Sequence, residues 1–163
     1  MRKGIIVLVA AFAAVLSVHA AGGPTLSAND YAEIHGLYAR YVWAFDSSDG
    51  DMFASVFTDD GEFVTGTRTT TGRKNLVAMA SRGPKKDHPK IFHITTNVLI
   101  TPSAEGAIGH AYVVLVDLAK NPAISGGGVY DDLIVRTPQG WKFKRRSYFP
   151  EPAPPSTTQI QVR

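Results

Sequence analysis

The second half of this chain consists of four long segments in which apolar and polar residues alternate with a period of two. These segments cover residues 91–101, 106–118, 128–137 and 141–149. Turn-forming residues separate them at Pro102-Ser103, Asn121-Pro122 and Pro138-Gln139-Gly140. Short connections between consecutive strands are typical of an antiparallel meander. The pattern therefore predicts a sheet that dominates the domain and leaves the first half of the chain to cover it.

The first half predicts helices and one short strand pair. Ser27 is a good N-cap residue with Asp30 at the third helical position, and apolar side chains follow at helical spacing as far as Phe45. Shorter helices are expected over 51–57 and 73–81, with two short strands at 62–64 and 67–71. These elements predict a single α+β domain, an antiparallel sheet with about three helices packed on one face.

Length and composition exclude several classes of protein. At 163 residues, 44% of them apolar, the chain suits one domain with a real core. It contains no cysteine, which excludes disulfide scaffolds, thiolate zinc sites, iron–sulfur clusters and cysteine nucleophiles. Asp46, His93 and His110 would suit a metal by type, but no local two-histidine motif anchors one. We expect neither a metal nor a cofactor.

The two ends of the chain differ in composition from the middle. Arg2 and Lys3 precede an apolar stretch over 4–18, and Val18-His19-Ala20 offers a cleavage site, which together predict a signal peptide over 1–20. The alternative is an uncleaved N-terminal anchor helix. We expect the domain over 21–150, a Pro-rich disordered tail over 151–163, and a periplasmic or secreted protein.

Cleavage also changes the charge balance. Without Arg2 and Lys3, the 17 basic residues fall to 15 against 14 acidic residues, a net charge of +1. Nucleic acid is not an expected partner at this balance, and no membrane association is expected after cleavage.

Two stretches resemble a known superfamily. The sequence YARYVWAFDSSDGD over 38–51, continuing to FTDDG over 57–61, resembles the opening of SnoaL-like, nuclear transport factor 2-like domains. The sequence GVYDDLIVR over 128–136, followed by GWKF over 140–143, is similar to their closing hairpin. The resemblance implies a cone-shaped half-barrel whose curved sheet wraps a pocket, and a homodimer that packs sheet faces. Relatives include scytalone dehydratase, ketosteroid isomerase, polyketide cyclases, epoxide hydrolases and members without chemistry.

Within the dehydratase branch, the resemblance assigns a catalytic pair to Asp46 and His93. An aspartate at the Asp46 position orients a histidine on the third strand, which His93 matches. A carboxylate that accepts from one imidazole nitrogen fixes the tautomer and leaves the other nitrogen to move protons. The alternative is structural, with His93 a satisfied strand residue and Asp46 bonded to backbone amides at the helix end.

The resemblance to ketosteroid isomerase places Tyr41 at the position of the tyrosine that stabilises the oxyanion in those enzymes. The general-base aspartate of those enzymes is replaced by Thr65, so their mechanism is not expected, and Tyr41 would donate a hydrogen bond to a ligand carbonyl. The sequence also departs from the dehydratase pattern, because the tyrosine that stands beside the aspartate in those enzymes is Phe45 here. Their second histidine would fall near Asp117.

The remaining site residues depend on which face of the strand 106–118 lines the pocket. His110 and Asp117 lie on opposite faces by the period of two, and the sequence leaves open which of them faces inward. We expect ligand-binding residues on the first helix and the strands: Tyr38, Val42, Phe45, Phe63, His110, Asp117, Tyr130 and Asp132.

These observations predict that the chain binds a small, mostly apolar molecule in a conical pocket. The leading interpretation is acid–base catalysis of the dehydratase, isomerase or cyclase kind, with His93, Asp46 and Tyr41 as catalytic residues. The alternative is a non-catalytic ligand-binding or interaction module, which the replacements at Phe45 and Thr65 favour.

Overall fold

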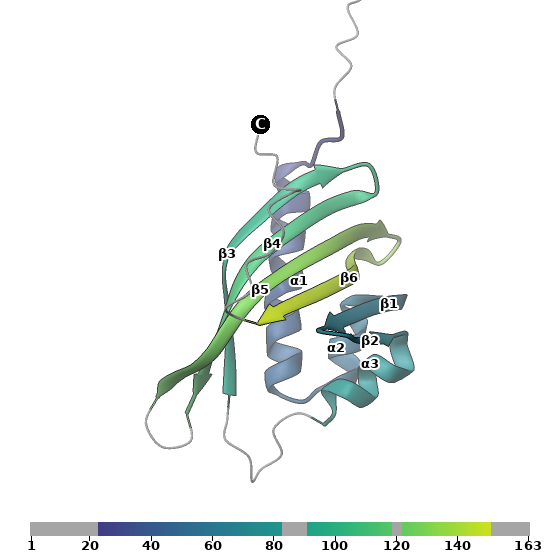
Figure 1. Ribbon diagram of the computed structural model, residues 1–163. Helices are drawn as coiled ribbons and strands as arrows, with labels where there is room; N and C mark the ends of the chain where they lie inside the picture. Colours follow the sequence, from purple (N-terminus) through teal and green to yellow (C-terminus); the bar gives the residue numbers. More distant parts are fainter. Residues whose placement is uncertain (1–22, 83–90, 119–121, 151–163) are drawn as a thin grey trace, which may run out of the picture.

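A computed structural model describes residues 23–82, 91–118 and 122–150. The expected signal peptide over 1–20 and the expected tail over 151–163 lie outside the described residues. Three helices and six strands form the domain (Figure 1). Their bounds are α1 Ala28–Asp46, α2 Gly50–Ser55, β1 Phe57–Thr65, β2 Arg68–Thr71, α3 Arg73–Ala80, β3 Ile91–Ser103, β4 Gly106–Asp117, β5 Ala123–Thr137 and β6 Gly140–Pro150.

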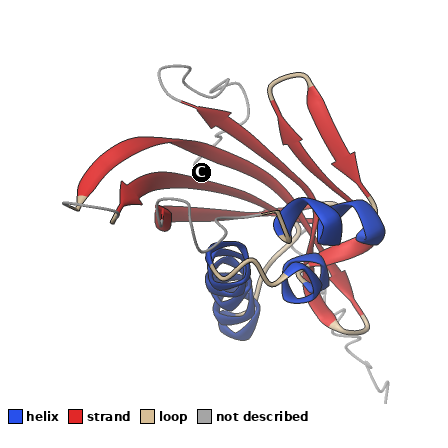
Figure 2. Cartoon of the chain, turned by 90° about the horizontal axis from the view of Figure 1, so that it is seen from below, coloured by secondary structure: helices blue, strands red, loops and turns tan. Residues whose placement is uncertain are grey.

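The six strands form one curved sheet in the order β2-β1-β6-β5-β4-β3. Viewed from below, the three helices gather on one side of it (Figure 2). The expected α+β architecture is confirmed, with one difference: β1 pairs with β6 in parallel, so the sheet is mixed. No tight turn joins these two strands, since one helix and four strands lie between them in the chain. Turn geometry therefore does not set their relative direction.

Two element boundaries differ from the sequence-based expectation. The second helix ends at Ser55, and β1 begins at Phe57 rather than at Glu62. Strand β5 begins at Ala123 rather than at 128, and it includes the three glycines at 126–128. At Gly128, a Cβ atom would lie 2.2 Å from the Phe149 carbonyl oxygen. The glycine is needed here for close approach of neighbouring backbone rather than for a turn.

Helix α1 provides one wall of the core. Its N-terminus carries the expected capping box, in which Ser27 and Asp30 satisfy each other's backbone amides. Its buried residues are Ile34, Leu37, Tyr38, Tyr41 and Ala44. The Tyr41 ring packs among Phe53, Phe57 and Phe143, so that aromatic side chains fill the space between α1, α2 and the sheet. No helix in the described part of the chain is long and apolar enough to cross a membrane.

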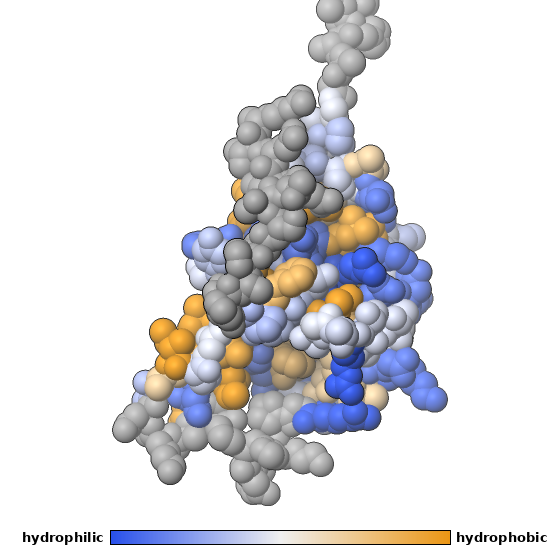
Figure 3. All heavy atoms as spheres, in the orientation of Figure 1, coloured by the Kyte–Doolittle hydropathy of each residue, from blue (hydrophilic) through white to orange (hydrophobic). Residues whose placement is uncertain are grey.

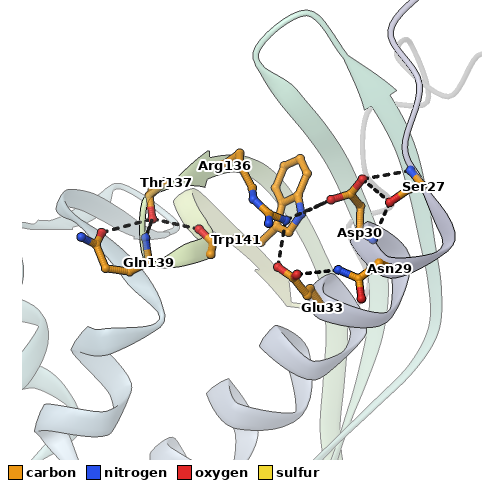
Figure 4. A network of polar contacts seen from close by, with 9 residues as sticks. Ser27, Asn29, Asp30, Glu33, Arg136, Thr137, Gln139 and Trp141 are labelled. Atoms are coloured by element: carbon orange, nitrogen blue, oxygen red, sulfur yellow. Dashed lines mark hydrogen bonds and ion pairs between the residues drawn. The ribbon is translucent and has the colours of Figure 1, made fainter.

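A polar network ties the start of α1 to the turn between β5 and β6 (Figure 4). The Asp30 carboxylate accepts from the Trp141 indole N–H at 2.9 Å and from Arg136 at 3.0 Å. Arg136 also bonds Glu33 at 2.9 Å, one turn further along the helix. The network fixes the angle at which α1 leaves the sheet, and with it the position of the other end of the helix.

The hydrogen bonds to Asp30 predict a pH-dependent helix start. The Ser27 hydroxyl, then Trp141 and the Ser27 amide, lower the pKa of Asp30 to about 2. A lowered pKa in the folded state stabilises the fold above the unfolded-state value of 3.8, and this contribution disappears as the pH falls through about 2. We expect Asp30→Asn to lower the thermal midpoint at pH 7, with the difference from wild type vanishing near pH 2. A difference that persists unchanged at pH 2 would contradict the assignment.

Candidate active site

The last residue of α1 and the start of β3 bring the predicted pair together. The Nδ1 atom of His93 lies 2.6 Å from Oδ1 of Asp46, and the His93 backbone N–H donates to Oδ2 at 3.1 Å. Both side chains are largely buried. The geometric condition for an oriented histidine is therefore met, while the catalytic role of the pair stays a prediction.

Local structure explains why Asp46 is available for this contact. Helix α1 stops at Asp46, and Ser48 follows with a positive φ of 58° before Asp49 caps α2. Strand β3 is the edge of the sheet, so its outward backbone N–H groups have no neighbouring strand. The Asp46 carboxylate satisfies one of these amides and the imidazole together, which holds the ring against the helix end.

A cleft of about 230 Å³ opens at this pair, between α1 and β3. Its lining is mostly apolar and consists of Val42, Trp43, Asp46, Phe92, His93 and Ile94. The Phe45 ring stands edge-on to the imidazole, with centroids 4.9 Å apart. Trp43 is 73% exposed, which is unusual for a tryptophan in a monomer and places a large flat side chain at the mouth of the cleft.

The pair has the chemistry of an oriented base. Because the ionised carboxylate only accepts hydrogen bonds, Nδ1 of a neutral His93 carries the proton and Nε2 carries the lone pair. Among the described residues Nε2 forms no hydrogen bond, so it is available to a molecule in the cleft. In the described ranges no group of three His, Cys, Asp or Glu residues is placed to hold a metal ion.

A second polar cluster lies deep in the core. Arg146 of β6 and Asp132 of β5 form a two-bond ion pair at 2.8 and 2.7 Å, and both side chains are fully buried. Tyr38 donates to the same carboxylate at 2.5 Å. The Arg146 guanidinium lies 4.0 to 4.7 Å from the centroids of four rings, those of Phe143, Tyr41, Tyr130 and Tyr38. This is a satisfied carboxylate with a cation held in an aromatic cage.

The cage keeps its tyrosines protonated. Burial raises the pKa of Tyr41, and burial raises the pKa of Tyr38 and Tyr130 still further. Burial is the largest influence on the pKa of Arg146 and lowers it, but the charge and hydrogen bonds of Asp132, together with Tyr41 and Tyr38, outweigh burial, so the pKa of Arg146 is raised. The Tyr41 hydroxyl and one Arg146 nitrogen, Nη1, are buried without a hydrogen bond of normal geometry. Tyr41 therefore lies inside the core, and the described cleft does not include it.

Most of the predicted site residues lie in one of two regions, the cleft and the buried core. Asp46, His93 and Val42 line the cleft, with Phe45 in contact with the imidazole. The buried core contains Tyr38, Tyr41, Phe63, Tyr130 and Asp132.

The strand register settles the face that the sequence left open. Leu115 pairs with His93 and Asp117 with Ile91, so Asp117 shares the helix-facing side of β4 with them. His110 lies on the opposite face, beside Asp131.

Sequence reasoning missed three lining residues, namely Trp43, Phe92 and Ile94. Alternation along β3 places Phe92 and Ile94 on the face away from His93, and nothing in the pattern indicates that they reach the cleft. They do so because β3 is the edge strand, where side chains from both faces border the same opening. For Trp43, its position outside the apolar arc of α1 was the available signal.

Comparison with known proteins identifies the fold and the family. A family model described as SnoaL-like domain matches residues 26–147, about three quarters of the chain. The chain belongs to the SnoaL-like domain family. The resemblance seen in the sequence is thereby confirmed. A search of the curated proteins found no match.

Solved structures share the fold of this SnoaL-like domain. Rv3472 from Mycobacterium tuberculosis, described as of unknown function, is 25% identical with a TM-score of 0.68, covering 82% of this chain and 78% of its own. An ntf2-like protein with a cystatin-like fold from Novosphingobium aromaticivorans is 21% identical with a TM-score of 0.70, covering 83% and 90%. A putative scytalone dehydratase from the same organism is 22% identical with a TM-score of 0.60, covering 75% and 84%.

Proposed function

We propose that this SnoaL-like protein is an acid–base enzyme without a cofactor that acts on a small, mostly apolar, oxygenated molecule. One observation carries the proposal: a histidine oriented by a carboxylate at 2.6 Å borders an apolar cleft of about 230 Å³. A base in an apolar cleft can remove a proton from carbon or oxygen once the bound substrate has displaced the water there. The reaction class is that of a dehydratase, isomerase or cyclase.

The proposed dehydration step uses only the histidine. Nε2 of His93 takes a proton from the carbon beside a carbonyl group, and the electron pair forms the new C=C bond as the hydroxyl leaves. The imidazolium then gives its proton to the departing hydroxyl, so water is released and His93 ends neutral. Asp46 holds the ring and stabilises the imidazolium between the two transfers.

The lining of the cleft defines the substrate class. Four of its six lining residues are apolar, and the two polar ones are the catalytic pair itself. We propose a flat or compact uncharged substrate that packs against Trp43 and Phe92. A charged substrate would lose its hydration in this cleft without a matching group.

Tryptophan fluorescence tests the binding half of this proposal. The chain has two tryptophans, and Trp141 is only 6% exposed, so Trp43 is the one that a molecule in the cleft can reach. We expect 5-nitroindole, a flat nitroaromatic quencher, to quench Trp43 with saturation. Phe92→Ala should weaken this binding by about tenfold, because it removes an aromatic side chain that the bound molecule would cover, a loss of more than about 1 kcal/mol.

The control for this experiment is Trp43→Phe, which keeps an aromatic ring in the cleft and removes the signal. Quenching that is linear in quencher concentration, or unchanged in Trp43→Phe, would show that 5-nitroindole does not bind in the cleft and would contradict the proposed substrate class.

A non-catalytic binding module is the second candidate. Phe45 is the specific observation in its favour, since this ring contacts His93 where a tyrosine hydroxyl would otherwise hold a ligand oxygen. Under that reading the cleft stores or senses an apolar molecule. Binding of 5-nitroindole without any proton-transfer activity would support this second candidate.

Two further proposals concern the setting of the protein. We propose that residues 1–20 direct export and that the mature protein acts in the periplasm or outside the cell. Mass determination of the N-terminus of the protein recovered from a secreting host tests this, with a start at Ala21 expected. We also propose that the protein is a homodimer.

A further inference from the structure

A second cleft, larger than the one at His93, lies among α2, β1, α3 and the turn that joins β5 to β6. Its volume is about 460 Å³, against about 230 Å³ for the His93 cleft, and the two share no described lining residue. Eight of the nine described residues that line it have polar or charged side chains. Figure 3 shows hydrophilic residues along the right side of the molecule, where Figure 1 places β1 and the β5–β6 turn. We call this space the polar cleft.

An irregularity in the pairing of β1 with β6 forms one wall of the polar cleft. Phe57 of β1 pairs with Phe143 of β6. The next pairing joins Glu62 to Arg145, so residues 58–61 of β1 stand opposite a single residue of β6. Three of these four extra residues line the polar cleft. Bulges are frequent beside functional sites, because they turn side chains away from the regular ladder.

Lys142 of β6 brings a half-buried ammonium group to the polar cleft. Its Nζ atom donates to the carbonyl oxygen of Ser55, the last residue of α2. This partner carries no net charge, and among the described residues Lys142 forms no ion pair. Because an ammonium group has three N–H donors, two of them are available to a ligand.

The environment of Lys142 acts mainly against its ionised form. Burial lowers the pKa of Lys142, and the charges of Arg40 and Arg73 lower it further. Asp59 raises the pKa, but this is the smallest of the four influences. Neighbouring cations disfavour the charge of Lys142, and in the described ranges no carboxylate bonds to it, so the ammonium group lacks a counterion. An anion in the polar cleft would supply one.

Two of the other charged groups that line the polar cleft already form ion pairs. Arg73 pairs with Asp51 at 3.2 Å, and both side chains are largely exposed. Asp60 pairs with Lys144. Of the two cations among the described lining residues, Lys142 is therefore the one without an anionic partner.

The hydroxyl groups of the polar cleft are placed to accept hydrogen bonds from a ligand. The Ser55 hydroxyl donates to the Met52 carbonyl oxygen at 2.7 Å. The Thr137 hydroxyl donates to the Gly140 carbonyl oxygen at 2.8 Å. Each hydroxyl oxygen keeps at least one lone pair. The Asp59 carboxylate also lines the cleft and forms no hydrogen bond within the described part of the chain. These acceptors match a ligand that carries hydroxyl groups.

We propose that the polar cleft binds a small hydroxylated anion, of the sugar acid or sugar phosphate class, at a site separate from the His93 cleft. The anionic group of the ligand lies against Lys142 and supplies its counterion. The hydroxyl groups donate to Asp59 and to the hydroxyl oxygens of the lining. A neutral sugar lacks the charge that Lys142 requires. This site does not depend on the proposed function, because the two clefts share no described lining residue.

Isothermal titration calorimetry at low ionic strength tests this proposal, with glucuronate, glucose 6-phosphate and glucose as the three probes. We expect at least one of the two anions to bind with one site per chain, and glucose to bind at least about tenfold more weakly. Tighter binding of glucuronate would identify a carboxylate site, and tighter binding of glucose 6-phosphate would identify a phosphate site.

Variants of the lining show whether the binding is local. Lys142→Met keeps the apolar stem and removes the charge, so it should weaken binding of the anion at least about tenfold, whereas Lys142→Arg should retain most of the affinity. The matched control is Lys74→Met, which removes an exposed lysine of α3 outside the described lining and should bind as wild type. Circular dichroism shows whether each variant is folded.

Several outcomes would overturn the polar cleft as an anion site. These are the absence of binding by both anions, equal binding of glucose, a folded Lys142→Met that binds as wild type, and an equal loss in Lys74→Met, which would show a general attraction to a basic surface. If Lys142→Met does not fold, Arg73→Gln decides, because it removes the other lining cation, and unchanged affinity in that variant would overturn the site.

A second titration separates this proposal from the proposed function. Binding of 5-nitroindole should be unchanged when the polar cleft is saturated with the anion, and competition between the two would overturn the separate site. A protein that binds the anion but not 5-nitroindole supports the polar cleft and contradicts the substrate class proposed for the His93 cleft.

Discussion

Replacing His93 with alanine should lower the rate of proton abstraction by about 10²- to 10⁴-fold, the range that a positioned general base contributes. The substrate for this measurement is 5-nitrobenzisoxazole, a flat uncharged molecule whose C–H proton is removed as its N–O bond breaks, releasing a coloured phenoxide. It requires only a base in an apolar cleft, which is what the Asp46–His93 geometry offers. Product absorbance gives kcat/KM for both proteins.

Asp46→Asn tests whether the negative charge of Asp46, rather than its shape, supports the reaction. The amide has the shape of the carboxylate and can still accept from the His93 backbone N–H, but it no longer compensates an imidazolium. We expect kcat to fall at least about tenfold, with a smaller change in KM, because the group acts on the charged intermediate rather than on substrate binding.

His35→Ala is the matched control for both variants, because His35 is an exposed histidine on α1, the helix that carries Asp46. The rate of this variant should equal that of wild type. Wild-type turnover that survives in His93→Ala would contradict the assignment of the base. If both site variants unfold, the Asp46–His93 pair is structural, and the non-catalytic candidate gains support.

Asp132→Asn should be the most destabilising conservative change in the core. It removes the negative charge from an ion pair in which both side chains are fully buried and leaves the Arg146 cation uncompensated among four aromatic rings. Breaking a buried pair from one side costs about 3–5 kcal/mol in the free energy of unfolding. For a domain of this size the thermal midpoint should fall by the order of 10–20 °C, measured by calorimetry.

Two further proteins show whether the charge is responsible. Glu62→Gln breaks the exposed ion pair with Arg145 on neighbouring strands and should cost less than about 1 kcal/mol. The double variant Asp132→Leu, Arg146→Met removes both buried charges and should recover much of the stability that Asp132→Asn loses. A double variant as unstable as the single one would show that shape and packing, rather than the charge, dominate at this position.

The helix-and-strand content was predictable because it depends on local periodicity. The apolar arc of α1, its capping box and the alternation along β3, β4 and β6 all appear in the sequence, and all form as expected. The position of β1 beside β6 was not predictable, because a parallel pairing between distant strands leaves no local signal. The glycine run at the start of β5 has the composition of a turn, yet close backbone contacts place it in a strand.

Part of the candidate site was likewise predictable from the sequence, and part depended on the tertiary structure. A helix that ends in aspartate and a histidine near the start of a strand were visible in the sequence, and the family resemblance joined them. That Phe92 and Ile94 also line the cleft depends on β3 being the edge strand, which is a property of the whole sheet. The face of β4 that packs on the helices was likewise undetermined until the register was known.

By itself the sequence determined the order of the elements, the family and the pair Asp46–His93, because each depends on residue types at short spacing or on a matched motif. Only the tertiary structure decided that Tyr41, Tyr130 and Asp132 belong to a buried core around Arg146, and that His110 lies beside Asp131 on the sheet face away from the helices. The physical reason is that burial and pairing between strands depend on contacts across many residues, whereas alternation specifies two faces without saying which one the helices cover.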